Sequence, residues 1–390
     1  MQKRILYLLS LGHLVTDINQ GLLPIFLSVY KEQVGLTFTA ASLIPALSTI
    51  SSSVIQPLFG YLSDRYQLRW LLPTGCLLAG LGMAAFGLVP NYYLLTAIVF
   101  ISGLGVAAYH PEASKSAHYI SGPLQASSMA VFSVGGNLGF GLGPIIASLI
   151  LSHGGLKSSW LILFPTVVAV TLLAHTIPAI GRAMAAGQRA AAAGRQKENV
   201  GHTSLAAITL LVLVVILRSW LHTGLTYYIP FYYQHYLHGE AAFASTMLSI
   251  FLISGAVGTL VGGRLADYWG AKKMIIASML VLIPLVLAFP YVKGLWVAIL
   301  LALSGFAVVS TFAPAIVLAQ SLMPRHIGVA SGLMMGFAIG TGGLGLLLLG
   351  GIADARGVPF VIHLLAIIPA LAAALALPLP DLRRRPVKAH

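Results

Sequence analysis

Two acidic residues interrupt long apolar stretches of the chain, where groups that bind and release protons are most readily expected. The 390-residue chain has only nine Asp and Glu residues, and seven of them fit loops or helix ends. The other two, Asp17 and Glu112, fall inside apolar runs. In hydrocarbon, a carboxylate is protonated, paired with a cation or directed toward a water-filled cavity. All three conditions suit a proton carrier.

Histidines and a lysine lie near both carboxylates in the sequence. His13 precedes Asp17 by four residues, so the two side chains share one face of a helix. Lys115 follows Glu112 by three residues, so a salt bridge could satisfy both charges, whereas His110 points elsewhere. We predict proton-coupling roles for Asp17, Glu112 and His110. A structural His–Asp pair and a structural Glu–Lys pair are the alternatives.

A second pair, Arg218 and His222, is also spaced by four residues. An arginine keeps its proton under physiological conditions and binds carboxylates or phosphonates through its planar donors. We therefore predict that Arg218 and His222, together with His13, bind the substrate. The alternative for Arg218 is an ion pair with Asp17, and an anionic substrate could compete for that Arg.

Membrane helices must position these side chains, because the composition does not fit a soluble protein. Hydrophobic residues make up 58% of the chain and charged residues only 8%, against about 25% charged residues in a soluble domain. A helix needs about 20 apolar residues to cross the hydrocarbon. The sequence predicts an all-α membrane protein with twelve transmembrane helices, at roughly 5–30, 38–63, 70–89, 93–118, 123–152, 158–180, 204–234, 241–265, 273–291, 295–320, 326–352 and 358–378.

The basic residues predict the orientation in the membrane. The net charge of +13 comes from Lys and Arg between apolar runs, so it reports topology and gives no reason to expect a nucleic-acid partner. Assigning loops alternately to two sides puts 17 basic residues on one side and four on the other: Lys31, Lys157, Lys293 and Arg356. The majority side holds both termini, which we therefore place in the cytoplasm. The single cysteine, Cys76, excludes an internal disulfide.

A polar segment divides the predicted spans six and six. Residues 181–203 form the only long polar connection, which we interpret as a cytoplasmic linker. The predicted domains are an N-terminal six-helix bundle at 1–180, and a C-terminal six-helix bundle with a basic tail at 204–390. Together they form two pseudo-symmetric bundles.

The two halves repeat each other at an offset of 203 to 206 residues. The matched positions are Gly60 with Gly263, Asp64 with Asp267, Pro111 with Pro314 and Pro24 with Pro230. A parallel repeat of six spans is the architecture of one large transporter class, which binds its solute between the halves. At the same offset His110 and Glu112 match Ala313 and Ala315. The ionisable groups are not repeated, which favours a function over a packing role.

The loop after the second predicted span, and its repeat, resemble the loop pattern G-x-x-x-D-[RK]-x-G-[RK]-[RK] of the major facilitator superfamily. We predict gating loops formed by Gly60, Asp64, Arg65 and Arg69, and by Gly263, Asp267, Gly270 and Lys272. The first copy departs from the pattern at Gln67, where the family usually has Gly. Gly lets helices approach closely, and the Asp can cap the next helix or pair with a cation across the loop. Breaking that contact would let the halves rock, and a plain cytoplasmic turn is the alternative.

A glycine-rich run on the fifth predicted span resembles a motif typical of antiporters in the same superfamily. We predict that Gly135, Gly139, Gly143 and Pro144 pack this helix tightly against a neighbour. Ordinary helix packing explains the run equally well, so the run leaves the direction of transport open.

Three segments together resemble the fosmidomycin resistance protein family of drug exporters: residues 10–17, the Tyr-His-Pro-Glu-Ala-Ser-Lys run at 109–115, and the glycine-rich run. The resemblance implies a secondary active transporter of the inner (plasma) membrane that confers antibiotic resistance by proton-coupled efflux of a small, anionic drug. Proton-coupled uptake of an organic anion or other small metabolite remains the alternative.

An intramembrane enzyme or a metal-binding channel is a different class, which the sequence does not favour. The chain has no His-Glu-x-x-His motif, no phosphate-binding glycine loop and no cysteine cluster. We therefore expect no enzymatic activity, no metal and no cofactor other than the proton gradient. The expected partners are a small-molecule substrate, protons and the lipid bilayer, and we expect a monomer.

Overall fold

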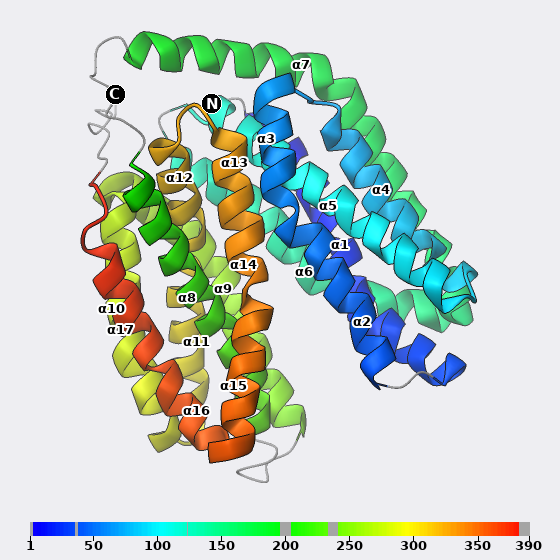
Figure 1. Cartoon of the computed structure of the whole chain (residues 1–390), viewed down its shortest axis with the longest axis vertical. Helices are drawn as coiled ribbons and strands as arrows, with labels where there is room; N and C mark the ends of the chain where they lie inside the picture. Colours follow the sequence, from blue (N-terminus) through cyan, green and yellow to red (C-terminus); the bar gives the residue numbers. More distant parts are fainter. Residues whose placement is uncertain (1–2, 36–37, 123, 196–203, 233–240, 382–390) are drawn as a thin grey trace. The chain divides into compact units, whose positions relative to one another are not determined.

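The fold is described here from a computed structural model of the whole chain, which describes residues 3–35, 38–122, 124–195, 204–232 and 241–381. Every regular element in this part of the chain is helical, as the sequence predicts. Two compact units are present (Figure 1), and within each of them the helices run alongside one another.

Unit 1 consists of Met1–Pro123, Val131–His202 and Arg325–Phe337, and unit 2 of Leu124–Ala130, Thr203–Pro324 and Ala338–His390. Each unit therefore contains one short segment from the other half of the sequence. The predicted domain limits at 180 and 204 stay a prediction.

The first half of the sequence folds into seven α-helices and three short segments of other helical type. In chain order these are α1 (Lys3–Val34), α2 (Phe38–Thr49), η1 (Ile50–Val54), α3 (Gln56–Tyr66), α4 (Leu71–Ala85), η2 (Phe86–Leu88), α5 (Tyr92–Ile120), α6 (Gln125–Gly154), η3 (Gly155–Ile162) and α7 (Leu163–Arg195). The segment η1 is a π-helix, and η2 and η3 are 3-10 helices. The helix α7 continues to Arg195, so the first part of the predicted linker is helical.

The second half is broken into more pieces. It contains α8 (Leu205–Phe231), α9 (Ala241–Trp269), α10 (Ala271–Ala288), η5 (Phe289–Tyr291), α11 (Leu295–Ser310), α12 (Phe312–Leu322), α13 (Ile327–Gly332), η6 (Leu333–Phe337), α14 (Ala338–Gly340), α15 (Gly342–Arg356), α16 (Val358–Leu365) and α17 (Ile367–Ala376). The segment η6 is a second π-helix.

Ten helical stretches of the described residues are long and apolar enough to cross a membrane. One of them, Ile145–Ala190, has 46 residues and reaches into both the fifth and the sixth predicted span. The helix α1 has 32 residues but is not among the ten. It carries His13, Asp17 and Asn19 near its middle, which lowers its apolar character. The predicted number of twelve spans stays a prediction.

Glycines on α6 let it approach α1 closely in unit 1. An added Cβ at Gly139 would collide with the carbonyl of Leu14, and one at Gly143 would collide with the backbone of Gly21. Gly135 faces the carbonyl of Ser10 in the same way. The predicted packing role of the glycine run is therefore seen in the contacts of these three residues, whereas the Pro144 side chain lies outside the described residues.

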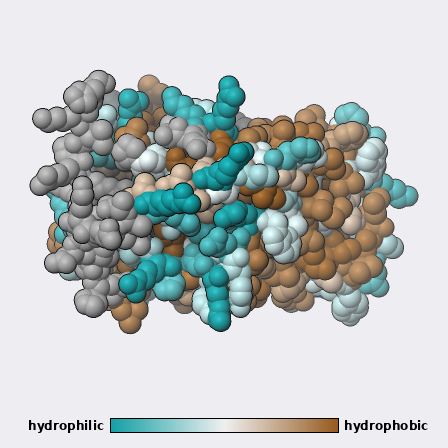
Figure 2. Space-filling view, turned by 90° about the horizontal axis from the view of Figure 1, so that it is seen from above, coloured by the Kyte–Doolittle hydropathy of each residue, from teal (hydrophilic) through white to brown (hydrophobic). Residues whose placement is uncertain are grey.

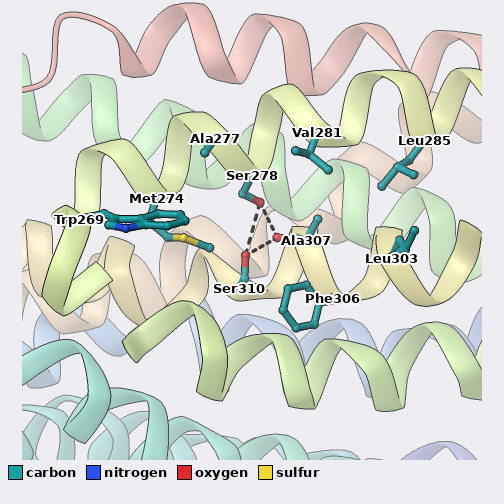
Figure 3. A pocket seen from close by; sticks show the side chains of 10 residues that line it. All are labelled: Trp269, Met274, Ala277, Ser278, Val281, Leu285, Leu303, Phe306, Ala307 and Ser310. Atoms are coloured by element: carbon teal, nitrogen blue, oxygen red, sulfur yellow. Dashed lines mark hydrogen bonds between the residues drawn. The ribbon is translucent and has the colours of Figure 1, made fainter. Parts of the chain in front are cut away.

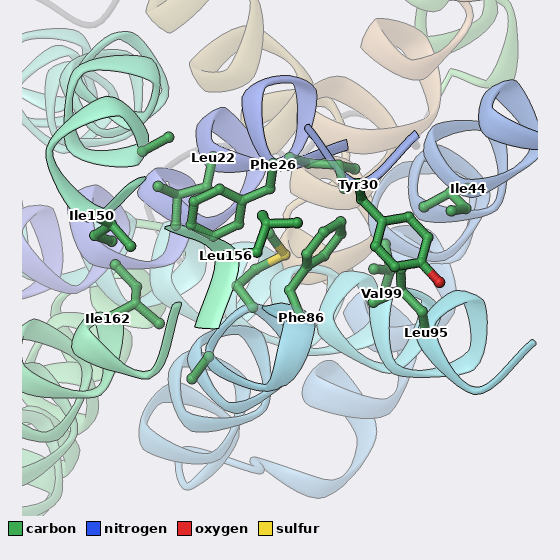
Figure 4. Close-up of a cluster of buried hydrophobic side chains, with 14 of the residues drawn as sticks. Leu22, Phe26, Tyr30, Ile44, Phe86, Leu95, Val99, Ile150, Leu156 and Ile162 are labelled. Atoms are coloured by element: carbon green, nitrogen blue, oxygen red, sulfur yellow. The ribbon is translucent and has the colours of Figure 1, made fainter. Parts of the chain in front are cut away.

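A hydrophobic cluster lies within unit 1 (Figure 4), where side chains from α1, α2, α4, α5, α6, η2 and η3 converge. Phe26 of α1 and Phe86 of η2 lie with their ring centroids 5.6 Å apart. Tyr30 adds a ring contact with Phe86 and donates a hydrogen bond to the carbonyl of Pro90 at 3.2 Å. Full burial of such side chains contributes about 1.5–3 kcal/mol each in water. In a bilayer their close packing chiefly fixes how α1 lies against its neighbours.

The space-filling view shows hydrophilic residues in teal beside hydrophobic surface in brown (Figure 2). The exposed basic residues Arg65, Arg264, Lys273 and Arg325 lie at or next to helix ends. This border between polar ends and apolar flanks is the pattern of helices that span a bilayer.

Both copies of the gating loop need a residue with positive φ at the same repeat position. Gly270 precedes α10 with φ 92°, and its repeat mate Gln67 follows α3 with φ 51°. Glycine adopts such angles without strain, whereas other residues adopt them at a cost. The departure from the family pattern at Gln67 therefore changes the residue but keeps the turn.

We predict that Gly270→Ala lowers the stability of the protein by about 1–3 kcal/mol, the usual cost of a strained backbone. Cys76 is the only cysteine and is buried, so its reaction with a thiol-specific dye on heating reports unfolding. The matched control is Gly343→Ala, because this glycine is helical and no atom lies within 4 Å of the added Cβ. An equal melting temperature for the two variants would contradict the strain at residue 270.

Candidate functional site

His13, Asp17 and His110 form one buried cluster in unit 1, called here the Asp17 cluster. Asp17 Oδ1 lies 2.9 Å from His110 Nε2, and Asp17 Oδ2 lies 3.2 Å from His13 Nε2. The two histidines are only 3% and 6% exposed. The sequence predicted the contact within α1, but the contact between α1 and α5 joins residues 93 positions apart. The structure thus places His13, which was predicted to bind the substrate, in one cluster with the proton-coupling candidates Asp17 and His110.

Neighbouring backbone and side chains fix both rings. His13 Nδ1 lies 2.9 Å from the carbonyl of Phe132 on α6, and the His13 ring stacks on the Phe132 ring. The amide Nε2 of Gln56 lies 3.1 Å from His110 Nδ1 and donates to the carbonyl of Ser52 at 2.6 Å. The amide group must have this orientation, because the reverse would place its oxygen against the Ser52 carbonyl.

These contacts determine which ring nitrogens carry protons. A carbonyl only accepts, so His13 Nδ1 must carry a proton toward Phe132. Gln56 donates to His110 Nδ1, so the proton of a neutral His110 is on Nε2 and points at Asp17. His13 Nε2 also faces Asp17, and two neutral rings with an ionised carboxylate have no proton for this contact.

A third proton completes the Asp17 cluster. With that proton between His13 Nε2 and Asp17 Oδ2, every contact has one donor and one acceptor, and the cluster has no net charge. Without this proton, the lone pair of His13 Nε2 faces the carboxylate of Asp17, and the cluster has a net negative charge. An uncompensated charge is costly away from water, so the closed, buried geometry favours the protonated cluster.

The Asp17 cluster also has three metal-ligating groups within 4.8 Å of one another. A metal on His110 Nε2 would require the remaining proton of the ring to be on Nδ1. That proton would face the amide donor of Gln56, so two donors would oppose each other. The hydrogen bonds around the cluster therefore fit a proton better than a metal ion.

A glycine on α6 permits the contact between His13 and Asp17. An added Cβ at Gly136 would lie 2.5 Å from His13 Cε1 and 2.7 Å from Asp17 Oδ2. Gly136 therefore faces the cluster, whereas Gly135 and Gly139 face the backbone of α1.

Glu112 belongs to a separate cluster with Ser63, Asp64 and Lys115, called here the Glu112 cluster. Glu112 is fully buried, accepts a hydrogen bond from Ser63 Oγ, and lies 3.2 Å from Lys115 Nζ. Lys115 Nζ also donates to the Ser63 carbonyl at 2.7 Å and lies 3.6 Å from Asp64. The salt bridge predicted from the three-residue spacing is present, and Glu112 does not contact His110 through any interaction the structure records.

The two loop aspartates cap helices, but neither caps the helix that follows it. Asp64 accepts hydrogen bonds from the backbone N–H groups of Gly328 and Val329 at the start of α13, at 3.0 and 3.1 Å. Asp267 accepts from the N–H groups of Ala126 and Ser127 at the start of α6, at 3.0 and 2.9 Å. The expectation of a cap on the next helix is wrong, because a helix distant in sequence supplies unpaired N–H groups at the loop.

The remaining loop candidates have different surroundings. The two glycines lie where helices nearly touch, because an added Cβ at Gly60 would meet the Gly328 carbonyl and one at Gly263 would meet Ala126. Arg65 is exposed and donates to Tyr61 Oη, and Arg69 donates to the side chain of Gln67. Lys272 lies in the first turn of α10.

Arg218 is a buried cation in unit 2. It is 6% exposed, its Nε has no hydrogen-bond partner, and its guanidinium lies 5.4 Å from the centre of the Phe312 ring. Among the described residues of unit 2, no carboxylate lies within salt-bridge distance of Arg218. His222 lies one turn further along α8, with its ring centroid 5.5 Å from that of Phe251.

A pocket of about 290 Å³ lies elsewhere in unit 2, between α10 and α11 (Figure 3). Its walls are apolar apart from Ser278 and Ser310, which both donate to the Ala307 carbonyl. Neither Arg218 nor His222 lines it, so this pocket is separate from the candidate anion site.

Two residues of the Asp17 cluster's surroundings, Gln56 and Gly136, were not predicted from the sequence. Gln56 is a polar residue inside the second predicted span, which is a signal that it needs a buried partner. Gly136 directly follows Gly135 in the glycine-rich run, which is a signal of close helix approach at both positions. Both signals were present, but neither identifies the partner.

Comparisons with known proteins agree with this description. The Major Facilitator Superfamily model matches residues 9–344 and 211–390. The fosmidomycin resistance protein of Escherichia coli is 31% identical over 387 residues, covering 98% of this chain and 94% of that protein.

Among solved structures, the E. coli fucose:proton symporter is similar with a TM-score of 0.71 and 19% identity, covering 95% of this chain and 97% of that one. The human organic anion transporter MFSD10 is similar with a TM-score of 0.73 and 18% identity, covering 96% and 99%. At these identities the likeness concerns the fold.

We predict that Gly136→Ala disrupts the contact between His13 and Asp17 and lowers stability by about 1–3 kcal/mol, the usual cost of overpacking. The dye reaction of Cys76 on heating measures this loss. Gly141→Ala is the matched control on the same helix, because no atom lies within 4 Å of its added Cβ. If Gly136→Ala were as stable as Gly141→Ala, the close approach of α6 to the cluster would be wrong.

Proposed function

Because the chain belongs to the major facilitator superfamily, it is a multi-pass membrane transporter and not an enzyme, and we propose that it exports a small anionic compound in exchange for protons by alternating access. Fosmidomycin is the first candidate substrate, because a relative that is 31% identical carries its name. The basic residues support an inner membrane location with both termini and the linker in the cytoplasm.

The single observation that carries the proposal is the Asp17 cluster. Its hydrogen bonds are complete with one more proton than two neutral histidines and a carboxylate possess. Loss of that proton leaves a net negative charge in a site that is nearly sealed from solvent. The anionic form therefore favours a conformation in which water reaches the cluster. Protonation and the opening of a cavity are coupled in this way.

The Glu112 cluster supports a different role for the second carboxylate. Lys115 Nζ lies 3.2 Å from Glu112 Oε2, which also accepts from Ser63, so the cation offsets the charge of this carboxylate directly, whereas Glu112 Oε1 is buried without a hydrogen-bond partner. Lys115 also contacts Asp64, which caps α13. We propose that Glu112 supports the gating contact of Asp64, and that Asp17 is the main proton carrier. His110 then has a supporting role, in which its Nε2 holds Asp17 Oδ1 in place.

The buried guanidinium of Arg218, whose Nε has no hydrogen-bond partner, supports an anionic substrate. Among the described residues of unit 2 it has no carboxylate partner, and burial strengthens its interaction with an incoming anion. His222 on the same helix supplies a further nitrogen that could donate to an oxygen of the substrate. Uptake of an organic anion with protons would use the same groups in the opposite direction, so the direction must be measured.

We predict that pH gradients drive accumulation of fosmidomycin in proteoliposomes with an acidic lumen and an alkaline exterior. Protons leaving the lumen would exchange for substrate entering it. Asp17→Asn should abolish this accumulation but retain exchange of labelled for unlabelled substrate, because the neutral amide cannot carry the proton. Accumulation would be followed with radiolabelled substrate.

The control for this substitution is Asp381→Asn, an exposed carboxylate that follows the last helix. It should accumulate substrate as the unmodified protein does. Accumulation only with the reversed gradient would support proton-coupled uptake instead of efflux. Normal accumulation by Asp17→Asn would remove Asp17 as the carrier.

We predict that Arg218→Ala weakens binding of fosmidomycin by about tenfold to a hundredfold, because a hydrogen bond to a charged group contributes about 1.5–3 kcal/mol. Binding of a neutral phosphonate diester should change much less. Isothermal titration with purified protein measures both affinities. Arg264→Ala, at an exposed position, is the control. Equal losses for the charged and neutral ligands would contradict charge recognition by Arg218.

A further inference from the structure

We propose that Gln56 is the positioning residue that holds the transported proton between His13 and Asp17, and that it links this proton to the packing of α13 and η6 against α3. The inference rests on the proposed proton coupling. The Asp17 cluster lies on α1 and α5, whereas Gln56 is an uncharged residue on a third helix, α3. Its amide determines which tautomer His110 adopts.

Two hydrogen bonds fix the side chain of Gln56. Its side chain is 2% exposed, and its Nε2 donates both to the Ser52 carbonyl at 2.6 Å and to His110 Nδ1 at 3.1 Å. Its Oε1 is buried without a hydrogen-bond partner. Leaving an amide oxygen unpaired is unfavourable, so the arrangement is maintained by the two bonds that the nitrogen makes.

The amide acts through the tautomer of His110. While Gln56 donates to Nδ1, the single proton of neutral His110 stays on Nε2 and is committed to Asp17 Oδ1. The additional proton is then confined to the contact of Asp17 Oδ2 with His13 Nε2. Without the donor, His110 can carry its proton on Nδ1, its Nε2 can accept, and the additional proton has two alternative sites.

Two glycines from the second half of the sequence, Gly332 and Gly336, pack against Gln56. An added Cβ at Gly332 would lie 2.8 Å from the Gln56 carbonyl, and one at Gly336 would lie 2.5 Å from Gln56 Cβ. Both glycines belong to the segment Arg325–Phe337, which packs within unit 1. If this segment moved away from α3, Gln56 would lose these contacts. Its amide would then no longer keep the proton of neutral His110 on Nε2.

Two π-helical segments meet beside this amide. The segment η1 ends two residues before Gln56, and Gly336 belongs to η6. Contacts between η1 and η6 exist in addition to those between α3 and η6. The π-helix is rare and is found mainly at functional sites. Its occurrence on both sides of Gln56 agrees with a segment that changes its packing during the transport cycle.

The repeat shows that the arrangement belongs to one half only. At offset 203, Gln56 matches Thr259 and His110 matches Ala313, so neither the donor nor the ring is repeated. Thr259 is also fully buried and bonds to the Gly255 carbonyl of its own helix. A role in helix packing alone would not require the amide at residue 56.

Among the residues that the structure describes, few ionisable side chains face the Asp17 cluster. Those with recorded contacts are His13 and Asp17 from α1, and His110 with the neighbouring phenol of Tyr109 from α5. Tyr109 donates to the Leu9 carbonyl, and α6 contributes the Phe132 carbonyl and the backbone at Gly136. The polar contact from α3 is the uncharged Gln56.

The decisive experiment compares Gln56→Met with the unmodified protein by NMR of selectively ¹⁵N-labelled histidine. His110 signals are assigned from the spectrum of His110→Gln. In the unmodified protein we expect His110 protonated on Nε2 only. In Gln56→Met, which keeps the length of the side chain but removes the donor, we expect a second population protonated on Nδ1. The substrate accumulation ratio at an imposed pH gradient should fall toward one.

Gln56→Glu provides a conditional rescue. Its carboxylic acid can donate to His110 Nδ1 only while it is protonated, so the normal tautomer should return in acidic buffer and be lost in alkaline buffer. Thr259→Val is the matched control from the other half and should change neither the tautomer nor the accumulation ratio. A protein that is merely destabilised at residue 56 would not show this dependence on pH.

The outcomes separate this inference from the proposed function. An unchanged His110 tautomer in Gln56→Met, or a changed tautomer with normal accumulation, overturns the role of Gln56. If the unmodified protein shows no accumulation in either gradient, the proposed proton coupling fails. The NMR comparison still decides whether Gln56 sets the tautomer.

Discussion

The burial of a carboxylate between two histidines is the constraint on which the rest of unit 1 depends. Asp17 is stable in an apolar bundle only if neighbouring groups satisfy both of its oxygens, and two helices are needed for that. The close approach of α6 through its glycines, the Phe132 carbonyl and the amide of Gln56 all serve to hold the two rings. A proton is the smallest addition that makes this arrangement neutral.

The repeat separates what the fold requires from what the chemistry requires. Asp64 and Asp267 occupy matched positions and make matched contacts, each with two backbone N–H groups at the start of a helix from the other half of the sequence. By contrast His110, Glu112 and Lys115 match Ala313, Ala315 and Leu318 at offset 203, so these ionisable groups are confined to one half. Arg218 and His222 are in the other unit. The scaffold is therefore duplicated, whereas the groups that we propose for protons and for an anion lie in different units.

Sequence reasoning succeeded where the relevant contacts are local. Helical spacing predicted the pairing of His13 with Asp17 and of Glu112 with Lys115, and apolar runs located helical segments near every predicted span. It failed where partners come from distant segments, because spacing within one helix carries no information about its neighbours. The contact of His110 with Asp17 and the cap of Asp64 on α13 are of this kind. The seventh span was the least certain in the sequence, because it is long and contains Arg218 and His222, yet the structure has the continuous helix α8 there.

The helix α3 connects the two clusters mechanically. At its first residue, Gln56 contacts η6 and the Asp17 cluster, and near its last turn Asp64 contacts α13 and the Glu112 cluster. The segments α13 and η6 are continuous, so the same piece of chain bears on both ends of α3. Displacement of α13 and η6 would therefore break the Asp64 cap and change the tautomer of His110 in one step. In the transport cycle proposed above, a proton bound at Asp17 and a contact closed at Asp64 would favour the same packing of α13 and η6, and this shared preference would couple the two events.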